Sequence, residues 1–160
     1  MVKLITIPKE MSDLERLKTT VMVAKVSQKN YINATRQELA KFERLSDEDV
    51  TEFLNEFRCD ERLVDTLLSS GKISSTMALD IVEHSNYRLG ACVSACIAYE
   101  DNENFLLTII INVIQKNYYN CFTIIEKFAK QISEVGFQML LNITHFDPKI
   151  VRIYRRNQCL

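Results

Sequence analysis

Three segments that resemble one another decide the fold: MALDIVEHSNYRL at residues 77–89, FLLTIIINVIQKNYY at 105–119 and GFQMLLNITHFDPKIVRI at 136–153. Each has an apolar helical stretch, a polar turn and the start of a second apolar stretch. The Asn86-Tyr87 pair recurs 31 positions later at Asn117-Tyr118, and Asp147-Pro148 follows after a further 30. A period of about 30 residues is typical of stacked helix pairs, because each pair buries its apolar face against the next.

Composition agrees with a helical chain. The chain has 160 residues with only 3 Gly and 2 Pro, whereas a fold of many short strands needs a turn every few residues. We therefore predict an all-α protein, a single domain by its length. The net charge of −1 gives no general attraction for nucleic acid or an acidic membrane, so neither is expected as a partner.

The paired segments resemble the ankyrin repeat. Leu79–Val82 with Ser85–Tyr87 fits the first helix and turn of that family, and Met139–Ile143 with residues 147–153 fits both helices. Residues 62–71 look like the second helix and closing glycine of an earlier repeat. The resemblance covers residues 46 to 157 and is degenerate, since no intact Thr-Pro-Leu-His opening occurs. It implies a short α-solenoid with a concave face and a row of loop tips.

The remaining helix signals set the predicted boundaries. Ser12 with Glu15 and Thr35 with Glu38 have the capping-box spacing, while Ser46 and Asp60 are suitable N-caps for further helices; Gly71 is suited to ending the second of these. We predict a flexible N-terminus at 1–11, an N-terminal helical cap at 12–45 and three to four degenerate ankyrin-like repeats at 46–160. The sequence Gln28 to Asn33 nearly repeats at 115–120.

The resemblance also suggests where a partner binds. In ankyrin-like repeats the residues after the first helix face the concave groove, and the loops between repeats form exposed tips. This implies a contact surface at the two Asn-Tyr pairs, at one aromatic residue and at an acidic loop; the residues are Asn86, Tyr87, Asn117, Tyr118, Phe137, Glu100, Asp101 and Glu103. Half-buried tyrosines in turns and a solvated loop are the alternative interpretation of the same residues.

Evidence for catalysis or a cofactor is weak. His84 and His145 are the two histidines, and no nucleophile motif, phosphate-binding glycine loop or dinucleotide motif is present. Cys92 and Cys96 lie one helical turn apart, which lacks the usual spacing of a structural zinc site. We expect no catalytic residue, metal or cofactor, and free thiols in a reducing compartment. A small metal protein or enzyme around Cys92 and Cys96 is kept as an alternative.

The predicted function is a non-catalytic protein–protein interaction module that recruits or masks a protein partner in the cytoplasm or nucleus. An extension of this hypothesis is a pathogen-encoded inhibitor of host signalling resembling the kappaB inhibitors. A Bcl-2-like bundle, with Phe105 to Ile114 as its central helix and a groove for a partner's amphipathic helix, is the main alternative. Both a monomer and a homodimer fit the sequence. No secretion signal is recognised at the start of the chain, so export is not expected.

Overall fold

The computed structural model describes residues 11–27 and 30–159, and this part of the chain is all-α, as predicted. It contains ten α-helices and one 3₁₀ helix, and no strand. The chain divides into two compact units, residues 1–74 and 75–160. The single domain with repeats from residue 46 stays a prediction. The predicted flexible N-terminus falls almost wholly outside the described residues.

The first unit holds two helix pairs. Its helices are α1 (Asp13–Val26), α2 (Tyr31–Leu39), α3 (Asp47–Phe57) and α4 (Glu61–Ser69). The predicted capping box of Ser12 and Glu15 opens α1, and Ser46 and Asp60 cap α3 and α4 through their side chains. The core includes Leu17, Phe53 and Leu67, each at most 1% exposed.

The capping box predicted at Thr35 is wrong. The N-cap of α2 lies five residues earlier, at Asn30, whose side chain accepts a hydrogen bond from the Asn33 amide. Thr35 therefore lies inside the helix and is fully buried, and its hydroxyl donates to the Tyr31 carbonyl instead of to an N-cap partner. Of the near-repeat at 28–33, Gln28 and Lys29 lie outside the described residues.

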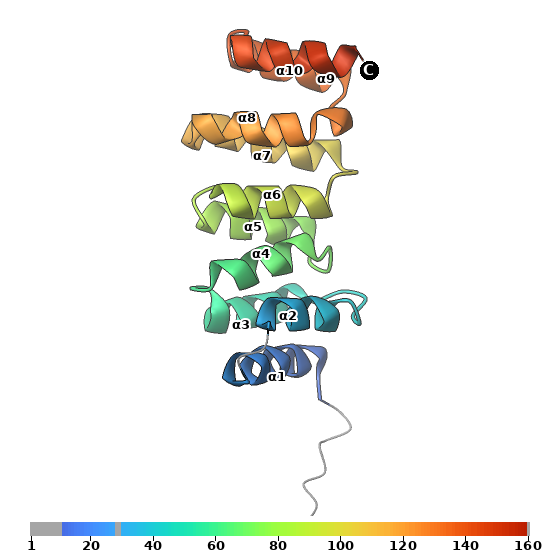
Figure 1. Ribbon diagram of the computed structural model, residues 1–160, viewed down its shortest axis with the longest axis vertical. Helices are drawn as coiled ribbons and strands as arrows, with labels where there is room; N and C mark the ends of the chain where they lie inside the picture. Colours follow the sequence, from blue (N-terminus) through green and yellow to red (C-terminus); the bar gives the residue numbers. More distant parts are fainter. Residues whose placement is uncertain (1–10, 28–29, 160) are drawn as a thin grey trace, which may run out of the picture. The chain divides into compact units, whose positions relative to one another are not determined.

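The second unit holds three helix pairs, which lie one on another from yellow-green to red in Figure 1. Its helices are α5 (Ser75–His84), α6 (Leu89–Ala98), α7 (Glu103–Lys116), α8 (Tyr118–Lys127), η1 (Ala129–Gln131), α9 (Glu134–Ile143) and α10 (Pro148–Gln158). Besides the contacts within pairs, α6 packs on α7 and α8, and α8 packs on α10. Each second helix therefore supports the next pair.

Corresponding positions in the three pairs carry the core. On the first helices these form three columns in which every side chain is buried: Ala78, Leu106 and Phe137; Ile81, Ile109 and Leu140; Val82, Ile110 and Leu141. A fully buried Leu, Ile or Phe side chain contributes about 1.5–3 kcal/mol by leaving water. The three pairs are thus stabilised by the same apolar pattern repeated along the chain.

The starts of the second helices follow one period through the whole chain. The N-cap residues of α2, α4, α6, α8 and α10 are spaced by 30, 28, 29 and 30 positions; they are Asn30, Asp60, Arg88, Asn117 and Asp147. Helix α2, which was predicted to belong to the N-terminal cap, follows the same period. Residues 30–33 and 117–120 of the near-repeat both begin a second helix, which accounts for their similarity.

Candidate functional site

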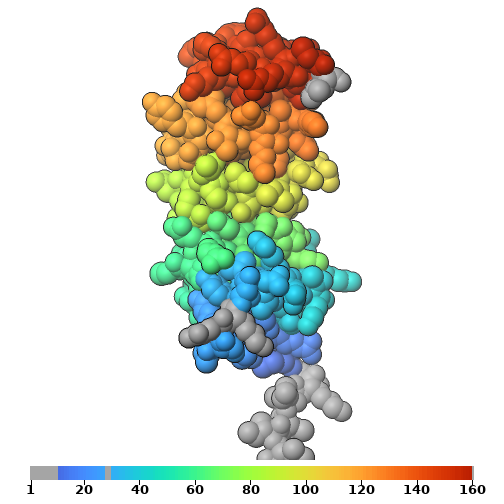
Figure 2. Space-filling model, in the orientation of Figure 1, coloured from blue at the N-terminus to red at the C-terminus, as the bar shows by residue number. Residues whose placement is uncertain are grey.

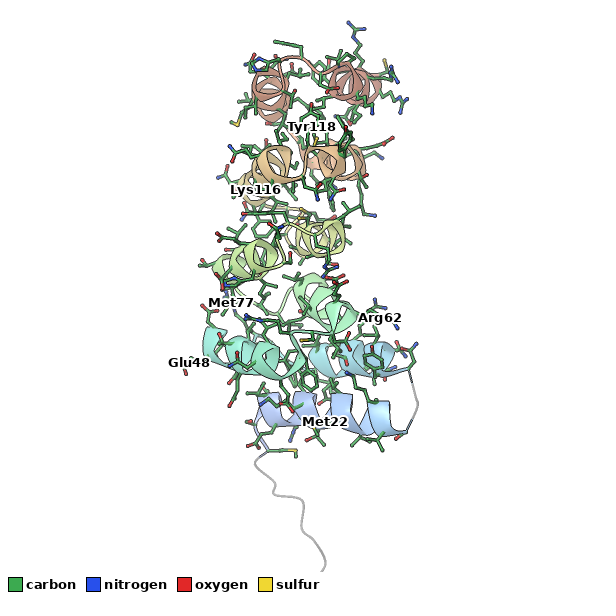
Figure 3. All side chains as sticks on the ribbon, turned by 90° about the vertical axis from the view of Figure 1, so that its left-hand side faces the viewer. Met22, Glu48, Arg62, Met77, Lys116 and Tyr118 are labelled. Atoms are coloured by element: carbon green, nitrogen blue, oxygen red, sulfur yellow. The ribbon has the colours of Figure 1, made fainter. Side chains whose placement is uncertain are left out.

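Tyr118 lies at the start of α8 and links two consecutive helix pairs. Its hydroxyl donates a 2.6 Å hydrogen bond to the carboxylate of Asp147, the N-cap of α10. Figure 3 shows Tyr118 at the level between the α7–α8 pair and the α9–α10 pair. Burial, the hydrogen bond to Asp147 and the charge of that carboxylate raise the pKa of Tyr118 to about 12. The same hydrogen bond lowers the pKa of Asp147 below its usual value.

Tyr31 makes the equivalent link in the first unit. Its hydroxyl lies 3.0 Å from the carboxylate of Asp60, the N-cap of α4. Burial alone would raise the pKa of Asp60. Hydrogen bonds from the Leu63 amide, Lys25 and Tyr31 outweigh burial and hold this pKa below its usual value. Both links join residues 29 positions apart, so the Asn-Tyr pair marks a repeated structural bridge.

Asn86 and Tyr87 occupy a different position in their repeat. Both have left-handed backbone, with φ of 56° and 53°, and they end α5 through a hydrogen bond from the Tyr87 amide to the Val82 carbonyl. His145 and Phe146 end α9 in the same way, with φ of 52° and 55°. In the structure, the counterpart of Asn117, the N-cap of α8, is Arg88, the N-cap of α6. The sequence match of Asn86-Tyr87 to Asn117-Tyr118 is therefore offset by two residues from the structural match. Asn86 is exposed and Tyr87 is half-buried, whereas Asn117 is the exposed N-cap of α8.

The acidic loop is only partly available to a partner. Glu100 and Asp101 are exposed in the turn before α7. Glu103 is half-buried, and its carboxylate accepts hydrogen bonds from the amide and the hydroxyl of Ser133, the N-cap of α9, at 3.2 Å and 2.6 Å. Glu103 is thus a second bridge between consecutive pairs, this time at the starts of the first helices.

Phe137 is a core residue. It is 1% exposed, and its ring lies 5.3 Å from the ring of Tyr154. The sequence assigned it to the binding surface, and the structure corrects that assignment because the ring occupies the column that holds Leu106 in the preceding pair. Its side chain cannot reach a partner in the folded protein.

An exposed apolar stripe on α9 was missed by the sequence analysis. Val135, Met139 and Ile143 are 74%, 41% and 39% exposed and follow the i, i+4, i+8 spacing of one helix face. The sequence does carry a signal for this stripe, because α9 has more apolar residues than fit on its buried face.

Internal comparison shows that the fold does not require this stripe. The corresponding residues on α5 and α7 are polar: Thr76, Asp80 and His84, and Asn104, Thr108 and Asn112. Several of these bond to their own helix, since Thr108 donates to the Asn104 carbonyl and Asn112 donates to the Thr108 carbonyl. Two of the three pairs therefore fold with polar side chains where α9 has Val, Met and Ile.

The cysteines and histidines do not form a cluster. Cys92, Cys96 and Cys121 are buried, and burial raises the pKa of Cys96 to about 12 and that of Cys121 to about 11. His84 contacts Asp80 on its own helix at the surface. Within residues 11–27 and 30–159, no group of three or more potential metal ligands comes together.

Comparison of the chain with models of protein families gave no match, and neither did comparison with curated proteins or with solved structures. In the described part of the chain, no helix combines the length and the apolar character that crossing a membrane requires.

Proposed function

We propose that this chain is a degenerate ankyrin-like repeat protein that binds a protein partner without catalysing a reaction. The observation that carries the proposal is the apolar stripe of Val135, Met139 and Ile143 on α9. The exposed parts of these apolar side chains lie at positions where the fold accepts polar ones, so folding alone does not require them. A surface of this kind is typical of a docking site for another protein.

The repeated helix pairs support the same proposal. Repeat proteins of stacked helices present the outer faces of equivalent helices side by side as one extended surface. On this surface α5 and α7 supply polar groups and α9 supplies the apolar anchor. Such a surface suits a partner with an apolar helix face flanked by hydrogen-bonding groups. The free thiols fit a reducing compartment such as the cytoplasm.

Of the two tyrosines first assigned to the partner-binding surface, only Tyr87 is kept as a candidate contact. Tyr118 uses its hydroxyl in the bridge to Asp147, so its removal would disturb the fold as well as any contact. Tyr87 is half-buried beside the exposed Asn86, and these two residues with Glu100 and Asp101 remain candidate contacts at the edge of the proposed surface.

The test replaces the stripe with the residues that α7 already carries at the same positions. In the triple variant Val135→Asn, Met139→Thr and Ile143→Asn, the helix keeps its buried face, so folding should be retained. The parent and the variant are tagged and used for affinity capture from cytosolic extract, with the helical content of both measured by circular dichroism. A matched control replaces three exposed polar residues of α2, which lies outside the proposed surface, by alanine: Asn33→Ala, Arg36→Ala and Gln37→Ala.

The expected result is a partner that the parent and the α2 control retain and the α9 variant loses. Retention of every captured protein by a folded α9 variant would refute the proposed site. Sedimentation of the parent at several concentrations distinguishes a heterologous partner from a second copy of the chain. Self-association that the α9 variant abolishes would identify the stripe as a homodimer interface instead.

A further inference from the structure

The outward face of α10 carries a second unusual surface, separate from the stripe on α9. Phe146, Val151, Arg152, Arg155 and Arg156 line an open groove there, together with Pro148 and Cys159. This segment forms part of the red surface in Figure 2. Phe146 is 55% exposed, and the three arginines are exposed as well.

The preceding pairs show what this face of a second helix does. The position of Arg155 on α10 corresponds to Cys96 on α6 and Ile125 on α8, counted from their N-caps, and both of those side chains are fully buried. Helix α6 packs on α8, and α8 packs on α10. The outward face of a second helix is therefore the side on which the next helices pack, and on α10 that side is lined by the groove.

The charge of the groove specifies what can occupy it. In the part of the chain that the structure describes, three arginines and no carboxylate line the groove. Among the described residues, Arg156 is the one arginine of the three that forms an ion pair, with Glu126 on α8 at 3.5 Å. At this position of α8, the apolar Ile125 suits packing against a purely apolar helix. A helix that packs on Arg155 of α10 must place an acidic group opposite it, because an unpaired buried charge is costly. The apolar residues Phe146, Pro148 and Val151 provide the complementary contact for an apolar edge.

Phe146 supports a binding role independently of charge. Its backbone is left-handed, with φ of 55°, and a bulky side chain in that region costs about 1–2 kcal/mol relative to glycine. More than half of its surface is exposed, so little burial offsets this cost. Tyr87 ends α5 with the same left-handed backbone but is half-buried, so the exposure of Phe146 sets it apart and leaves its ring free to contact another molecule.

We propose that the α10 groove binds an acidic amphipathic helix of a partner protein, with an apolar edge on Phe146 and Val151 and carboxylates opposite Arg152 and Arg155. The chain's own acidic helix, α3, does not meet this description, because its apolar residues are already buried. These residues are Val50, Phe53, Leu54 and Phe57. A single-stranded nucleic acid would use the arginines but would leave the apolar lining of Pro148 and Val151 unused.

The experiment measures binding of a fluorescein-labelled synthetic helix to the full chain by fluorescence anisotropy. The probe has leucines at i, i+4, i+7 and i+11 and glutamates on both flanks, and a second probe carries lysines in place of the glutamates. Charge reversal by Arg152→Glu/Arg155→Glu tests the basic side, and Phe146→Asn tests the apolar side. Arg16→Glu/Arg44→Glu, on exposed residues of the first unit, is the control with the same change in net charge.

The parent and the Arg16/Arg44 control should bind the acidic probe, and the Arg152/Arg155 variant should bind it at least about tenfold more weakly. That variant should instead gain affinity for the lysine probe, which also shows that it is folded. Phe146→Asn should weaken binding of the acidic probe by a similar factor, because it removes the apolar contact. Asparagine tolerates the left-handed backbone, so the turn should be kept.

Equal binding of the two probes by the parent would overturn the proposal, and so would unchanged binding by the Arg152/Arg155 variant. Arginine-dependent binding of an oligothymidine or oligouridine strand alone would assign the groove to nucleic acid and would also overturn it. So would arginine-dependent self-association in sedimentation, without binding of the acidic probe. Because none of these variants alters the α9 stripe, this proposal and the proposed function fail independently.

Discussion

Replacing Tyr118 by phenylalanine removes one hydroxyl and keeps the ring, so it isolates the bridge to Asp147. Tyr118 and Asp147 are both half-buried, and their oxygens lie 2.6 Å apart. A hydrogen bond to a charged group contributes about 1.5–3 kcal/mol. Partial exposure to solvent favours the lower end of this range. We therefore expect Tyr118→Phe to lower the free energy of unfolding by about 1.5 kcal/mol, or the melting temperature by about 3–6 °C for a chain of this length.

The assay is thermal and urea unfolding followed by circular dichroism, with Tyr119→Phe as the matched control. Tyr119 is the next residue of α8 and is 81% exposed, so loss of its hydroxyl should change the stability by less than about 0.5 kcal/mol. The ring of Tyr118 stays edge-on to Phe122, at 5.3 Å between centroids, which keeps the packing of the variant close to that of the parent.

The pH dependence gives a second readout of the same bond. The pKa of Asp147 is lowered in the folded state, so its contribution is present above about pH 4 and is lost as the pH falls through the folded value. The pKa of Tyr118 is raised to about 12, so its contribution is present below about pH 10 and is lost as the pH rises toward 12. The stability difference between parent and variant should therefore be constant from about pH 5 to 9 and shrink outside that range.

Equal stability of the parent and Tyr118→Phe at pH 7 would refute the bridge, and so would a loss no greater than that of Tyr119→Phe. A loss that did not shrink as the pH fell through the folded pKa of Asp147 would show that the hydroxyl stabilises the fold through some group other than the Asp147 carboxylate.

Further predictions concern other contacts of the repeats. Tyr31→Phe should cost about as much as Tyr118→Phe, roughly 1.5 kcal/mol in urea unfolding, because it removes the equivalent bond to an N-cap aspartate. Gly136→Ala should destabilise by about 1 kcal/mol instead of giving the usual helix gain, since a Cβ there would lie 2.6 Å from the Glu103 carboxylate; the loss should be smaller in a Glu103→Ala background in the same unfolding assay. Phe146→Asn should raise the free energy of unfolding by about 1 kcal/mol by relieving the left-handed backbone. In a native thiol titration with a disulfide reagent at pH 8, the two exposed cysteines should react and the three buried ones only after denaturation; the exposed pair is Cys59 and Cys159.

Much of the fold could be predicted from the sequence because its signals are local. The all-α class follows from the scarcity of glycine and proline, and Ser12, Ser46 and Asp60 act as caps where their spacing placed them. The Thr35 capping box failed because a threonine hydroxyl bonds equally well to a carbonyl one turn back inside a helix. The pattern alone does not distinguish the two uses.

The candidate site was less predictable because a helical chain gives no direct signal of which face meets solvent. Tyr118 and Glu103 were selected as surface residues, yet both make bridges whose partners lie 29 and 30 positions away. Phe137 was selected as an aromatic contact, yet it fills the core. Correct assignment required the register between repeats, and the offset of two residues at Asn86-Tyr87 obscured that register.

The internal repeats allow corresponding positions within one chain to be compared. Where folding alone sets the residue type, corresponding positions of the three pairs agree, as they do in the buried columns of the first helices. The last pair departs from the others in two opposite ways: α9 has Met139 where α7 has Thr108, and α10 has Arg155 where α8 has Ile125. The exposed arginine by itself fits a polar cap on the last pair, which keeps such an array soluble. A cap of that kind gives no reason for the apolar stripe on α9 or for the exposed ring of Phe146. The proposed contacts with other molecules would account for both, which is why the α9–α10 pair is the first place to test.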